Sequence, residues 1–507
     1  MGPADRLTAI LRALGAITLV GLVLAGCQLG SGPTEPSGRS APTAISSAPR
    51  PFTVMSTDRI RVTDPAAITD AASSVVSLNV FQRLMTADPG ESVLKPDAAR
   101  DCLFTAAATY TCTLNKKLFF HNGHPLTSSD VKFSIERAAR LNVPGSSVSL
   151  LSSLRRIDTP DPLTVRFVLS RADTQFGWAL ASPAASIVDE ELYPQDDLEP
   201  PDQPIIGSGP FVVAHRDDDS LLLTRYPHYV GRNPPRIDAL EYRTVADSAS
   251  IEDAMARGQV DVVWRGLNAA AVTRYTQQIT NSPDKVTVDG FSERPISGTR
   301  VLQLGWNPTS PMRADKALRQ AIAVALQGDR TLDSIVPGGV PGHLTTFPLG
   351  GRASAKTSWK NRIKLSLSYD STAPNALDVA TQIRTRLENS GGLSIQLRAD
   401  NPAADLQLLD RKAWTATGLA WLQPYLDAPL PAVATTLETV VSDFRQTTDA
   451  TAATRLLGVL QQQAAADCVL LPISQSDDYL FLRSGVSVNA TSFGPGWQLG
   501  LFGIHNG

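Results

Sequence analysis

The sequence lacks the common motifs of extracellular enzymes. Its 507 residues contain no His-Glu-x-x-His helix, no Gly-x-Ser-x-Gly elbow and no Walker loop. Of the six histidines, His121 and His124 lie close together, but the Asn-Gly and Pro around them predict a tight turn without further metal ligands. Asp217–Asp219 lies between two strand-like runs and predicts a solvated hairpin turn, not a calcium site. We therefore expect no catalytic residue, no metal and no cofactor.

Strong surface charge and long hydrophobic runs are also missing. The formal net charge is −3, and acidic and basic residues are evenly spread, so no basic patch favours a nucleic-acid partner. After residue 26, no apolar stretch approaches the roughly twenty residues that a bilayer-spanning helix needs. No internal repeat is present. These absences exclude nucleic-acid binding and a membrane-spanning body.

The start of the chain carries a targeting signal. Arg6 and Arg12 precede a short apolar run over residues 14–26 that ends in small residues, which is typical of a secretory signal peptide over residues 1–26. Leu24-Ala25-Gly26-Cys27 resembles the lipobox of bacterial lipoproteins, which implies cleavage before Cys27 and a diacylglycerol on its sulfur. The alternative is an ordinary secreted protein that is cleaved nearby. We expect a lipid anchor on the extracytoplasmic face of the bacterial cell membrane.

The composition changes twice after this signal. Residues 27–50 are mostly Ser, Gly, Pro and Thr, which predicts a flexible linker. Residues 51–507 exceed the ~250–300 residues at which a single core stops growing, so we expect two lobes. The linker would hold this body above the membrane surface.

Three cysteines remain in the body. Cys102 and Cys112 are ten residues apart around Phe104 and Tyr110, in a compartment that permits disulfides, and we predict that they close a hairpin. Cys468 lies in an apolar stretch and is expected to be a buried, unreactive thiol.

Hydrophobic spacing predicts a mixed α/β fold. Residues 363–369 alternate as a half-buried strand, residues 376–387 repeat at helical spacing, and residues 393–397 form a second strand. Strand, helix and strand in this order imply a parallel pair with a right-handed crossover. Thr127 and Asp130 are spaced as a capping box that starts a helix. Further predicted elements are helices over 313–327 and 451–467 and strands over 110–118, 163–169, 211–214, 469–473 and 479–482.

Several sequence blocks, in order, resemble the family 5 extracellular solute-binding proteins of ABC importers, the peptide/nickel or oligopeptide-binding class. Residues 111–134 (TCTLNKKLFFHNGHPLTSSDVKFS) meet every fixed position of the family pattern F-x-[DN]-G-x-P-[LF]-T-[AS]-x-D-V-x-[FY]-[ST]. Residues 207–240 carry its Gly-x-Gly-Pro-[Tyr/Phe] strand, and residues 258–263 its Gly-x-[Val/Ile]-Asp strand. Residues 315–327 resemble its V-R-x-A helix, with Arg319 and Ala321 in the fixed places.

This resemblance implies a bilobal fold like that of periplasmic binding proteins, type II, with an expanded first lobe and a ligand cleft between the lobes. It implies lobe I over 51–265, lobe II over 266–471 and a return to lobe I over 472–507. A protein of this kind is no enzyme: it captures a solute, in the first place a short peptide, by lobe closure and delivers it to ABC permease subunits, as a monomer. Two alternatives stay open: a non-transport lipoprotein scaffold, and a binder of haem, a metal chelate or an oligosaccharide.

The segment that would hold a peptide ligand departs from the family. Peptide-binding members have a segment like W-x-x-D-Y-x-[DE]-P, whose aspartate pairs with the ammonium terminus of the peptide. Here the matching segment is WLQPYLDAP over 421–429, in which Pro424 takes the place of that acid and Asp427 matches the later one. Residues 430–444 also look short for the family, so we expect a trimmed second lobe.

Aromatic side chains near the predicted cleft are the ligand-binding candidates. Aromatic rings give broad contacts that tolerate different ligands. The alternative for each tryptophan is a place in a core. Trp421 is the first choice, because its block matches the ligand-proximal segment of the family. The candidate set is Trp264, Trp306, Asn307, Trp421, Tyr425 and Asp427.

Overall fold

The computed structural model of the chain describes residues 50–88, 93–350, 362–373, 375–411, 414–415, 417–489, 493–494 and 498–507. The predicted signal peptide, Cys27 and all of the predicted linker except Arg50 lie outside the described residues. Residues 51–507 form one compact unit. The ranges below all belong to that unit.

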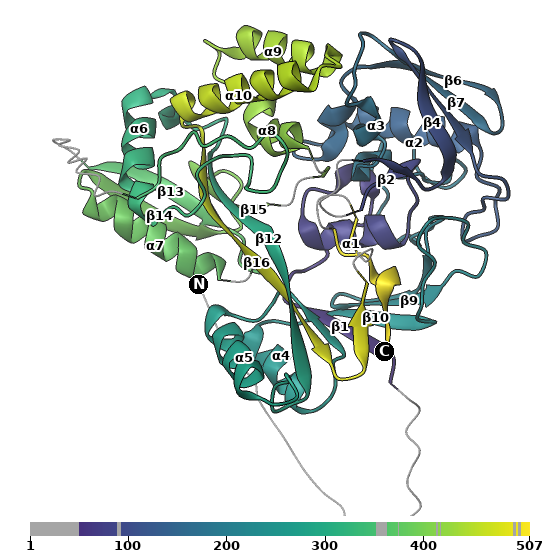
Figure 1. The fold of residues 1–507 in the computed structure, drawn as a ribbon, viewed down its shortest axis with the longest axis horizontal. Helices are drawn as coiled ribbons and strands as arrows, with labels where there is room; N and C mark the ends of the chain where they lie inside the picture. Colours follow the sequence, from purple (N-terminus) through teal and green to yellow (C-terminus); the bar gives the residue numbers. More distant parts are fainter. Residues whose placement is uncertain are drawn as a thin grey trace, which may run out of the picture. The chain divides into compact units, whose positions relative to one another are not determined.

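A ten-stranded mixed sheet runs through this unit (Figure 1). Strands early and late in the sequence alternate in it, so that β1 pairs with β10 and β11, while β11 also pairs with β16. In spatial order its strands are β14 (Leu393–Ala399), β13 (Ile363–Tyr369), β15 (Leu406–Arg411), β12 (Phe291–Trp306), β16 (Leu470–Arg483), β11 (Val262–Trp264), β1 (Phe52–Ser56), β10 (Ala239–Thr244), β9 (Ser220–Arg225) and β8 (Phe211–Arg216).

Two long antiparallel strands, β12 and β16, connect the two ends of this sheet. One end of β16 pairs with β11, and the other end of β12 pairs with β15. The β12–β16 ladder shifts register between Ile296 and Arg300, where Gly298 adopts a φ of 65° that a side chain would strain. The two strands predicted over 469–473 and 479–482 are therefore one strand of 14 residues. The polar residues between the two predicted strands do not predict a strand. They continue β16 because they form backbone hydrogen bonds with β12.

A second, antiparallel sheet has the order β4-β5-β7-β6. Cys102 lies opposite Cys112 in the β4–β5 pair, and the predicted disulfide joins them, which confirms that prediction. Cys468 is free and buried, as expected. The strand predicted over 110–118 ends earlier, at Leu114. The strands are β4 (Ala99–Ala106), β5 (Thr109–Leu114), β6 (Leu154–Asp161) and β7 (Thr164–Leu169).

The predicted local units are present. The side chain of Thr127 and that of Asp130 form the capping box of α2 (Ser128–Leu141). β13 and β14 are parallel and joined by α7 (Ala376–Asn389). The helix predicted from residue 313 begins instead at Lys316, because Asp315 caps it. Further helices are α1 (Ala71–Asn79), α3 (Phe176–Ala179), α4 (Ser248–Ala256), α5 (Ala269–Asn281), α6 (Lys316–Ala325), α8 (Gly418–Asp427), α9 (Ala434–Gln446) and α10 (Ala450–Asp467).

Buried apolar side chains form four clusters. One, which we call the C-terminal core, is built from residues between Val301 and Ile473. Another, the N-terminal core, is built from residues 66–187 together with Trp414. A third joins residues 54–264 to strand β16 and the C-terminus, and in the fourth α5 packs with Met55 and Phe481. Below, residues 50–290 are called the N-terminal region and residues 300–470 the C-terminal region; the lobe boundaries at 265 and 471 stay a prediction.

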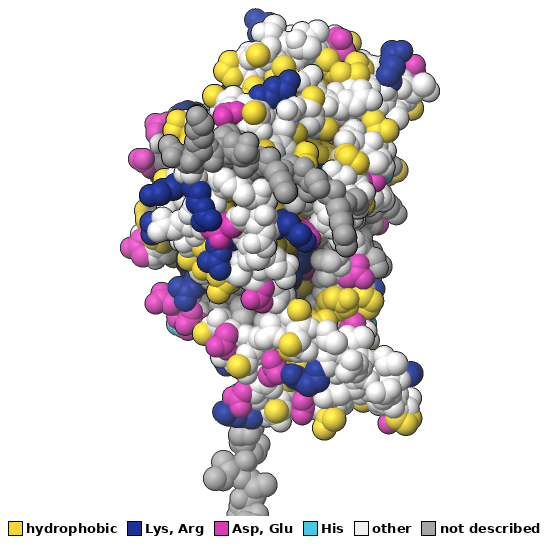
Figure 2. Space-filling model, turned by 90° about the vertical axis from the view of Figure 1, so that its left-hand side faces the viewer, with side chains coloured by type: hydrophobic (Ala, Val, Ile, Leu, Met, Phe, Trp, Pro, Cys, Tyr) yellow, Lys and Arg dark blue, Asp and Glu magenta, His cyan; other side chains and the backbone are white. Residues whose placement is uncertain are grey.

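The described surface fits the composition. On the face shown in Figure 2, basic and acidic side chains are interspersed. Among the described residues, no helix combines the length and the apolar character that crossing a membrane requires.

Candidate functional site

A pocket of about 630 Å³ lies between the N-terminal and C-terminal regions. We call it the cleft pocket. One wall is the segment 142–149 that follows α2, and the opposite walls come from the end of β12, from β15, from α8 and from the start of β16. A volume of this size is within the range of small-molecule sites. Both regions contribute, so a ligand here would contact each of them.

Local structure positions these walls. Asn142 ends α2 in the left-handed conformation (φ 44°), and Gly145 follows with φ 81°, so the chain turns sharply toward the pocket wall. On the other side, Trp306 is the last residue of β12. In α8, Thr417 caps the helix and Pro424 lies within it, lining the pocket.

Four of the six predicted ligand-binding residues line the cleft pocket: Trp306, Asn307, Tyr425 and Asp427. Pro424, the residue that replaces the family's acid, lines it too, while Asp427 is exposed. The pocket therefore lacks a carboxylate at position 424 and has one at position 427. Contact of the four predicted residues with a ligand stays a prediction.

Hydrogen bonds within the chain occupy the polar groups of two of these four residues. The Nδ2 of Asn307 donates to the carbonyls of Pro402 (2.8 Å) and Ala404 (3.0 Å), while its Oδ1 accepts from Thr309. The amide of Asn307 is thus fully used within the chain. The hydroxyl of Tyr425 donates to Asp467 (2.6 Å), and burial together with this bond raises its pKa. The ring of Tyr425, not its hydroxyl, is available to the pocket.

The other two candidates are not among the lining residues of the cleft pocket. Trp264 is 2% exposed and packs in the third core cluster. Trp421 is 7% exposed, belongs to the C-terminal core and has the guanidinium of Arg411 over its ring at 5.8 Å from the centroid. Burial lowers the pKa of Arg411 to about 10. Trp421 thus has the environment of a core residue.

Sequence reasoning missed Arg313, the cation of this pocket. Arg313 lies in a short 3₁₀ turn (Pro311–Ala314), lines the pocket and is 9% exposed. Its Nη2 donates to the carbonyl of Ala428. Burial, together with the nearby Arg319, lowers its pKa. The sequence pattern offers no sign of this role, because the residue directly precedes a helix and looks like part of its first turn.

A second pocket of about 710 Å³ adjoins the first, and Ser149 and Asp427 line both. A buried ion pair stands at its edge: Nη1 of Arg445 in α9 is 2.8 Å from Oδ2 of Asp173 in the N-terminal region. The backbone N–H of Thr174 donates to the carbonyl of Arg445 (2.6 Å). We call this contact the α9 pair. It joins the two regions beside the cleft.

A buried charge cluster joins the two regions at the point where β12 and β16 pass from one region to the other. We call it the Arg265 cluster. Arg265 follows β11 with a φ of 49°, and its guanidinium contacts Asp58 (2.6 Å), Asp410 (2.7 Å) and Asp478 (3.3 Å). Arg300 of β12 contacts Asp410 as well (3.2 Å). Burial raises the pKa of Asp58 to about 6, against the opposing effect of Arg265.

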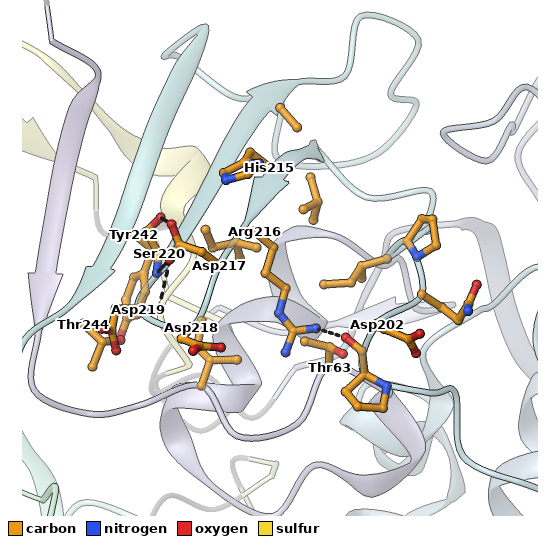
Figure 3. A pocket seen from close by; sticks show the side chains of 18 of the residues that line it. Thr63, Asp202, His215, Arg216, Asp217, Asp218, Asp219, Ser220, Tyr242 and Thr244 are labelled. Carbon is orange, nitrogen blue, oxygen red and sulfur yellow. Dashed lines mark hydrogen bonds between the residues drawn. The ribbon is translucent and has the colours of Figure 1, made fainter. Parts of the chain in front are cut away.

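Another hollow, about 820 Å³, lies wholly on the N-terminal region beside the β8–β9 hairpin. Figure 3 shows Arg216 reaching toward the loop of Asp202, where it donates to the carbonyl of Pro201 (2.9 Å). Asp217 accepts hydrogen bonds from Asp219 and Ser220 within the turn. The Asp217 side chain thus stabilises a hairpin turn, as predicted. The N-terminal region alone forms this hollow. We therefore regard the cleft pocket as the candidate site.

No group of three or more His, Cys, Asp or Glu side chains suited to a metal occurs in the described part of the chain. His121 is held within the fold, with its Nε2 3.0 Å from the carbonyl of Gly209. Burial lowers its pKa to about 4.

Comparison with known proteins gives several relatives that are named as binding proteins. The chain is 29% identical over 209 residues to the probable D,D-dipeptide-binding periplasmic protein DdpA of Escherichia coli K12, a match covering 39% of this chain and 40% of that protein. The chain thus spans about two fifths of the length of this curated relative.

Solved structures share the fold over most of the chain. One is AgaA of A. tumefaciens R10 in complex with agropinic acid (TM-score 0.77, 19% identity, covering 90% of this chain and 98% of that one). Another is the dipeptide-binding protein of Pseudoalteromonas sp. SM9913 in complex with Met-Leu (TM-score 0.76, 16% identity, covering 90% and 100%). These likenesses show a mixed α/β, bilobal fold of the periplasmic-binding-protein kind.

The family model for the middle region of the bacterial extracellular solute-binding proteins, family 5, matches residues 94–439. This match covers more than half of the chain and includes most of the residues that line the cleft pocket. The chain therefore belongs to the family 5 bacterial extracellular solute-binding proteins.

Proposed function

We propose that this protein is an extracytoplasmic substrate-binding protein that captures a small solute in the cleft pocket and delivers it to an ABC permease. The observation that carries the proposal is the position of the pocket, whose walls come from both regions of the fold. A ligand that contacts both regions binds the closed form better than the open one, and this difference is what drives closure.

We place the hinge in the long strands. β12 and β16 are shared by both regions, and their register shift near Gly298 interrupts the ladder between the part near β11 and the part near β15. The proposed lobes are those expected from the family: lobe I over 51–265 with the return segment 472–507, and lobe II over 266–471. Bending of the two strands would move these lobes against each other.

A short peptide is the first proposed ligand. The relatives named for dipeptide binding support it, and the pocket has room for a few residues. A non-peptide solute is the second candidate, supported by the likeness to the complex with agropinic acid. An open pocket of this size favours a binder over a scaffold that keeps only the fold.

The remaining parts of the proposal concern anchoring and partners. Cys27 would carry the lipid, residues 28–50 would act as a tether, and the protein would function as a monomer without catalysis. The variant Cys27→Ala tests the anchor: it should lose palmitate labelling and leave the membrane fraction. A variant that keeps both contradicts the assignment.

Native purification followed by mass spectrometry of the released ligand tests the central proposal. We expect peptides of a few residues, and calorimetry with a synthetic copy of a released species should reproduce binding. Release of haem, a metal chelate or an oligosaccharide would replace the peptide assignment. A cleft that releases nothing and binds no member of a peptide library would contradict solute capture.

A further inference from the structure

A glycine stands in the interior of the ten-stranded sheet, beside the cleft pocket. Gly305 is the last residue but one of β12, and it pairs with Gln407 of β15 on one side and with Leu470 of β16 on the other. Glycine weakens a strand at such a position, because it has no side chain to pack and loses much backbone freedom on folding. Its presence there needs a physical reason.

Neither the backbone nor the packing of the fold requires this glycine. Gly305 does not have a positive φ. A methyl group added to it would lie 3.4 Å from Cδ1 of Leu409 and 3.5 Å from Cδ1 of Leu470, which is ordinary van der Waals contact. At Gly207, in contrast, the added methyl group would collide with the backbone of Val80. The fold would therefore accept an alanine at position 305.

The room that Gly305 leaves belongs to the cleft pocket. Gln407 and Leu470 lie opposite Gly305 in the two neighbouring strands, so their side chains are on the same face of the sheet. Leu409 follows two residues after Gln407 and shares that face. All four residues line the cleft pocket. A side chain at position 305 would therefore reduce the pocket.

The surface around this room is apolar in what it offers to a ligand. The side-chain amide nitrogen of Gln407 donates to three backbone carbonyls of the turn before β15, at 3.1, 3.3 and 3.1 Å. The amide of Asn307 and the hydroxyl of Tyr425 are bonded within the chain as well. The methyl groups of Leu409 and Leu470 remain available for contact.

We propose that Gly305 determines specificity: it keeps open an apolar subsite, between Leu409 and Leu470, for a bulky apolar side chain or ring of the ligand. Removing such a group from water supplies affinity. A polar group of the same shape would lose its water without gaining a hydrogen bond. The rest of the ligand is free to be polar, since Arg313 and Asp427 line the same pocket. This inference rests on the proposed function and narrows its ligand class.

Peptide pairs of equal charge and similar shape test the inference on the unaltered protein. Calorimetry compares Ala-Leu with Ala-Asn, and Leu-Ala with Asn-Ala. In at least one position leucine should bind at least about tenfold more tightly than asparagine, because its side chain is buried at the subsite. Equal affinities in both positions overturn the inference while peptide binding stands.

Failure of all four peptides to bind would contradict the peptide assignment. The inference is then decided by the solute that native purification releases. A solute without a bulky apolar group overturns it. A solute that has one, and that Gly305→Val binds at least tenfold more weakly, supports it.

Variants at position 305 locate the effect. Gly305→Val fills the room between the two leucines and should weaken the preferred leucine peptide at least tenfold, but Ala-Ala less than about threefold. Gly305→Ala should have a smaller effect of the same kind, and in urea it should unfold no more easily than the wild type. A purely structural glycine predicts the reverse: lower stability of Gly305→Ala and an unchanged preference for leucine. That result overturns the inference.

Gly458 provides the matched control. It is buried in α10, and a methyl group added to it would meet Cδ2 of Leu344 at 3.4 Å, but it does not line the cleft pocket. Gly458→Ala and Gly458→Val carry the same substitutions away from the pocket and should keep the full preference for leucine. If they lose it as much as the variants of Gly305 do, a general effect on folding explains the loss and the inference falls.

Discussion

The Arg265 cluster and the α9 pair both join the N-terminal and C-terminal regions with buried charges, but they are built differently. The cluster places three carboxylates against two guanidinium groups. The α9 pair places one carboxylate against one guanidinium, and Asp173 also accepts hydrogen bonds from Ser153 (2.6 Å) and Gln175 (3.0 Å). The cluster has one negative charge in excess. Burial raises the pKa of Asp58, and the charge of Asp410 adds to this effect. The two contacts should therefore differ in their response to pH.

They also differ in position. The Arg265 cluster lies just after the ends of β1 and β11 and on β12, β15 and β16, where the long strands pass between the regions. The α9 pair lies beside the cleft, on the surface helix α9 and the loop before α3, next to α10 (Figure 1). Bending of the strands would leave the cluster largely intact and would separate the α9 pair. The cluster should thus control stability and the pair should control closure.

The largest expected effect comes from removing the centre of the cluster. Arg265→Met leaves Asp58, Asp410 and Asp478 buried without their shared cation, and should lower the free energy of unfolding by ~3–5 kcal/mol at pH 7.5. Urea unfolding measures this. The loss should shrink at pH 5, because protonated carboxyls no longer need the cation.

The control for Arg265 is Arg243→Met. Arg243 pairs with Glu241 (2.8 Å) on β10, and its side chain is 43% exposed. It should lose less than about 1 kcal/mol. Equal losses in the two variants would contradict the importance of burial in the cluster.

The next effect comes from the α9 pair. Arg445→Met should lower the free energy of unfolding by ~3 kcal/mol, since Asp173 stays buried with two hydrogen bonds but no cation. Adding Asp173→Asn should restore most of the loss, because the amide oxygen keeps accepting from Ser153 and the charge is gone. A double variant as unstable as the single one would show that packing, not charge, holds α9 in place.

A pH titration sharpens the contrast. The pKa of Asp58 in the folded protein, about 6, is above its ordinary value of 3.8 because of burial. The folded state then binds more protons between pH 4 and 6, so this group makes the protein more stable as the pH falls through that window. Asp58→Asn should remove this rise in stability. Arg265, Asp410 and Asp370 are the charges that act on it.

His121 works in the opposite direction over the same window. Its pKa is lowered to about 4 by burial, so its contribution to stability is lost as the pH falls from 6.5 to 4. Difference curves between wild type and Asp58→Asn isolate the carboxyl from the histidine. A difference curve that is flat from pH 4 to 6 would contradict the raised pKa of Asp58.

Local patterns predicted the fold better than they predicted the site. The capping box of Thr127 and Asp130 and the β13–α7–β14 unit depend on neighbours in the sequence, and both are present as expected. The length of β16 was missed because its pairing partner β12 lies about 180 residues earlier in the chain. Strand pairing over that distance leaves no local trace.

The cleft shows the same limit. Pro424, Tyr425 and Asp427 of the block over 421–429 line the pocket, whereas Trp421, the first choice in that block, does not. Arg313 and the segment 142–149 carry no local signature, since only the folded chain brings them to the same cavity. Trp414 lies between β15 and α8 and packs in the N-terminal core. Its sequence neighbours do not predict this packing either.

The smallest effect is expected from removing an exposed ion pair. One member of this pair is the sequence neighbour of a cluster residue. Arg59 follows the buried Asp58 directly, but its guanidinium reaches Asp219 in the β8–β9 turn (2.8 Å), where the two side chains are 53% and 61% exposed. Water and salt screen such a pair, so Asp219→Ala should change the free energy of unfolding by less than about 1 kcal/mol and by less still at 1 M salt. The backbone bond from Thr244 to the carbonyl of Asp219 (2.7 Å) does not depend on the side chain and should hold the turn in place. A loss comparable to that of Arg265→Met would mean that the hairpin, not the buried cluster, governs this end of the sheet.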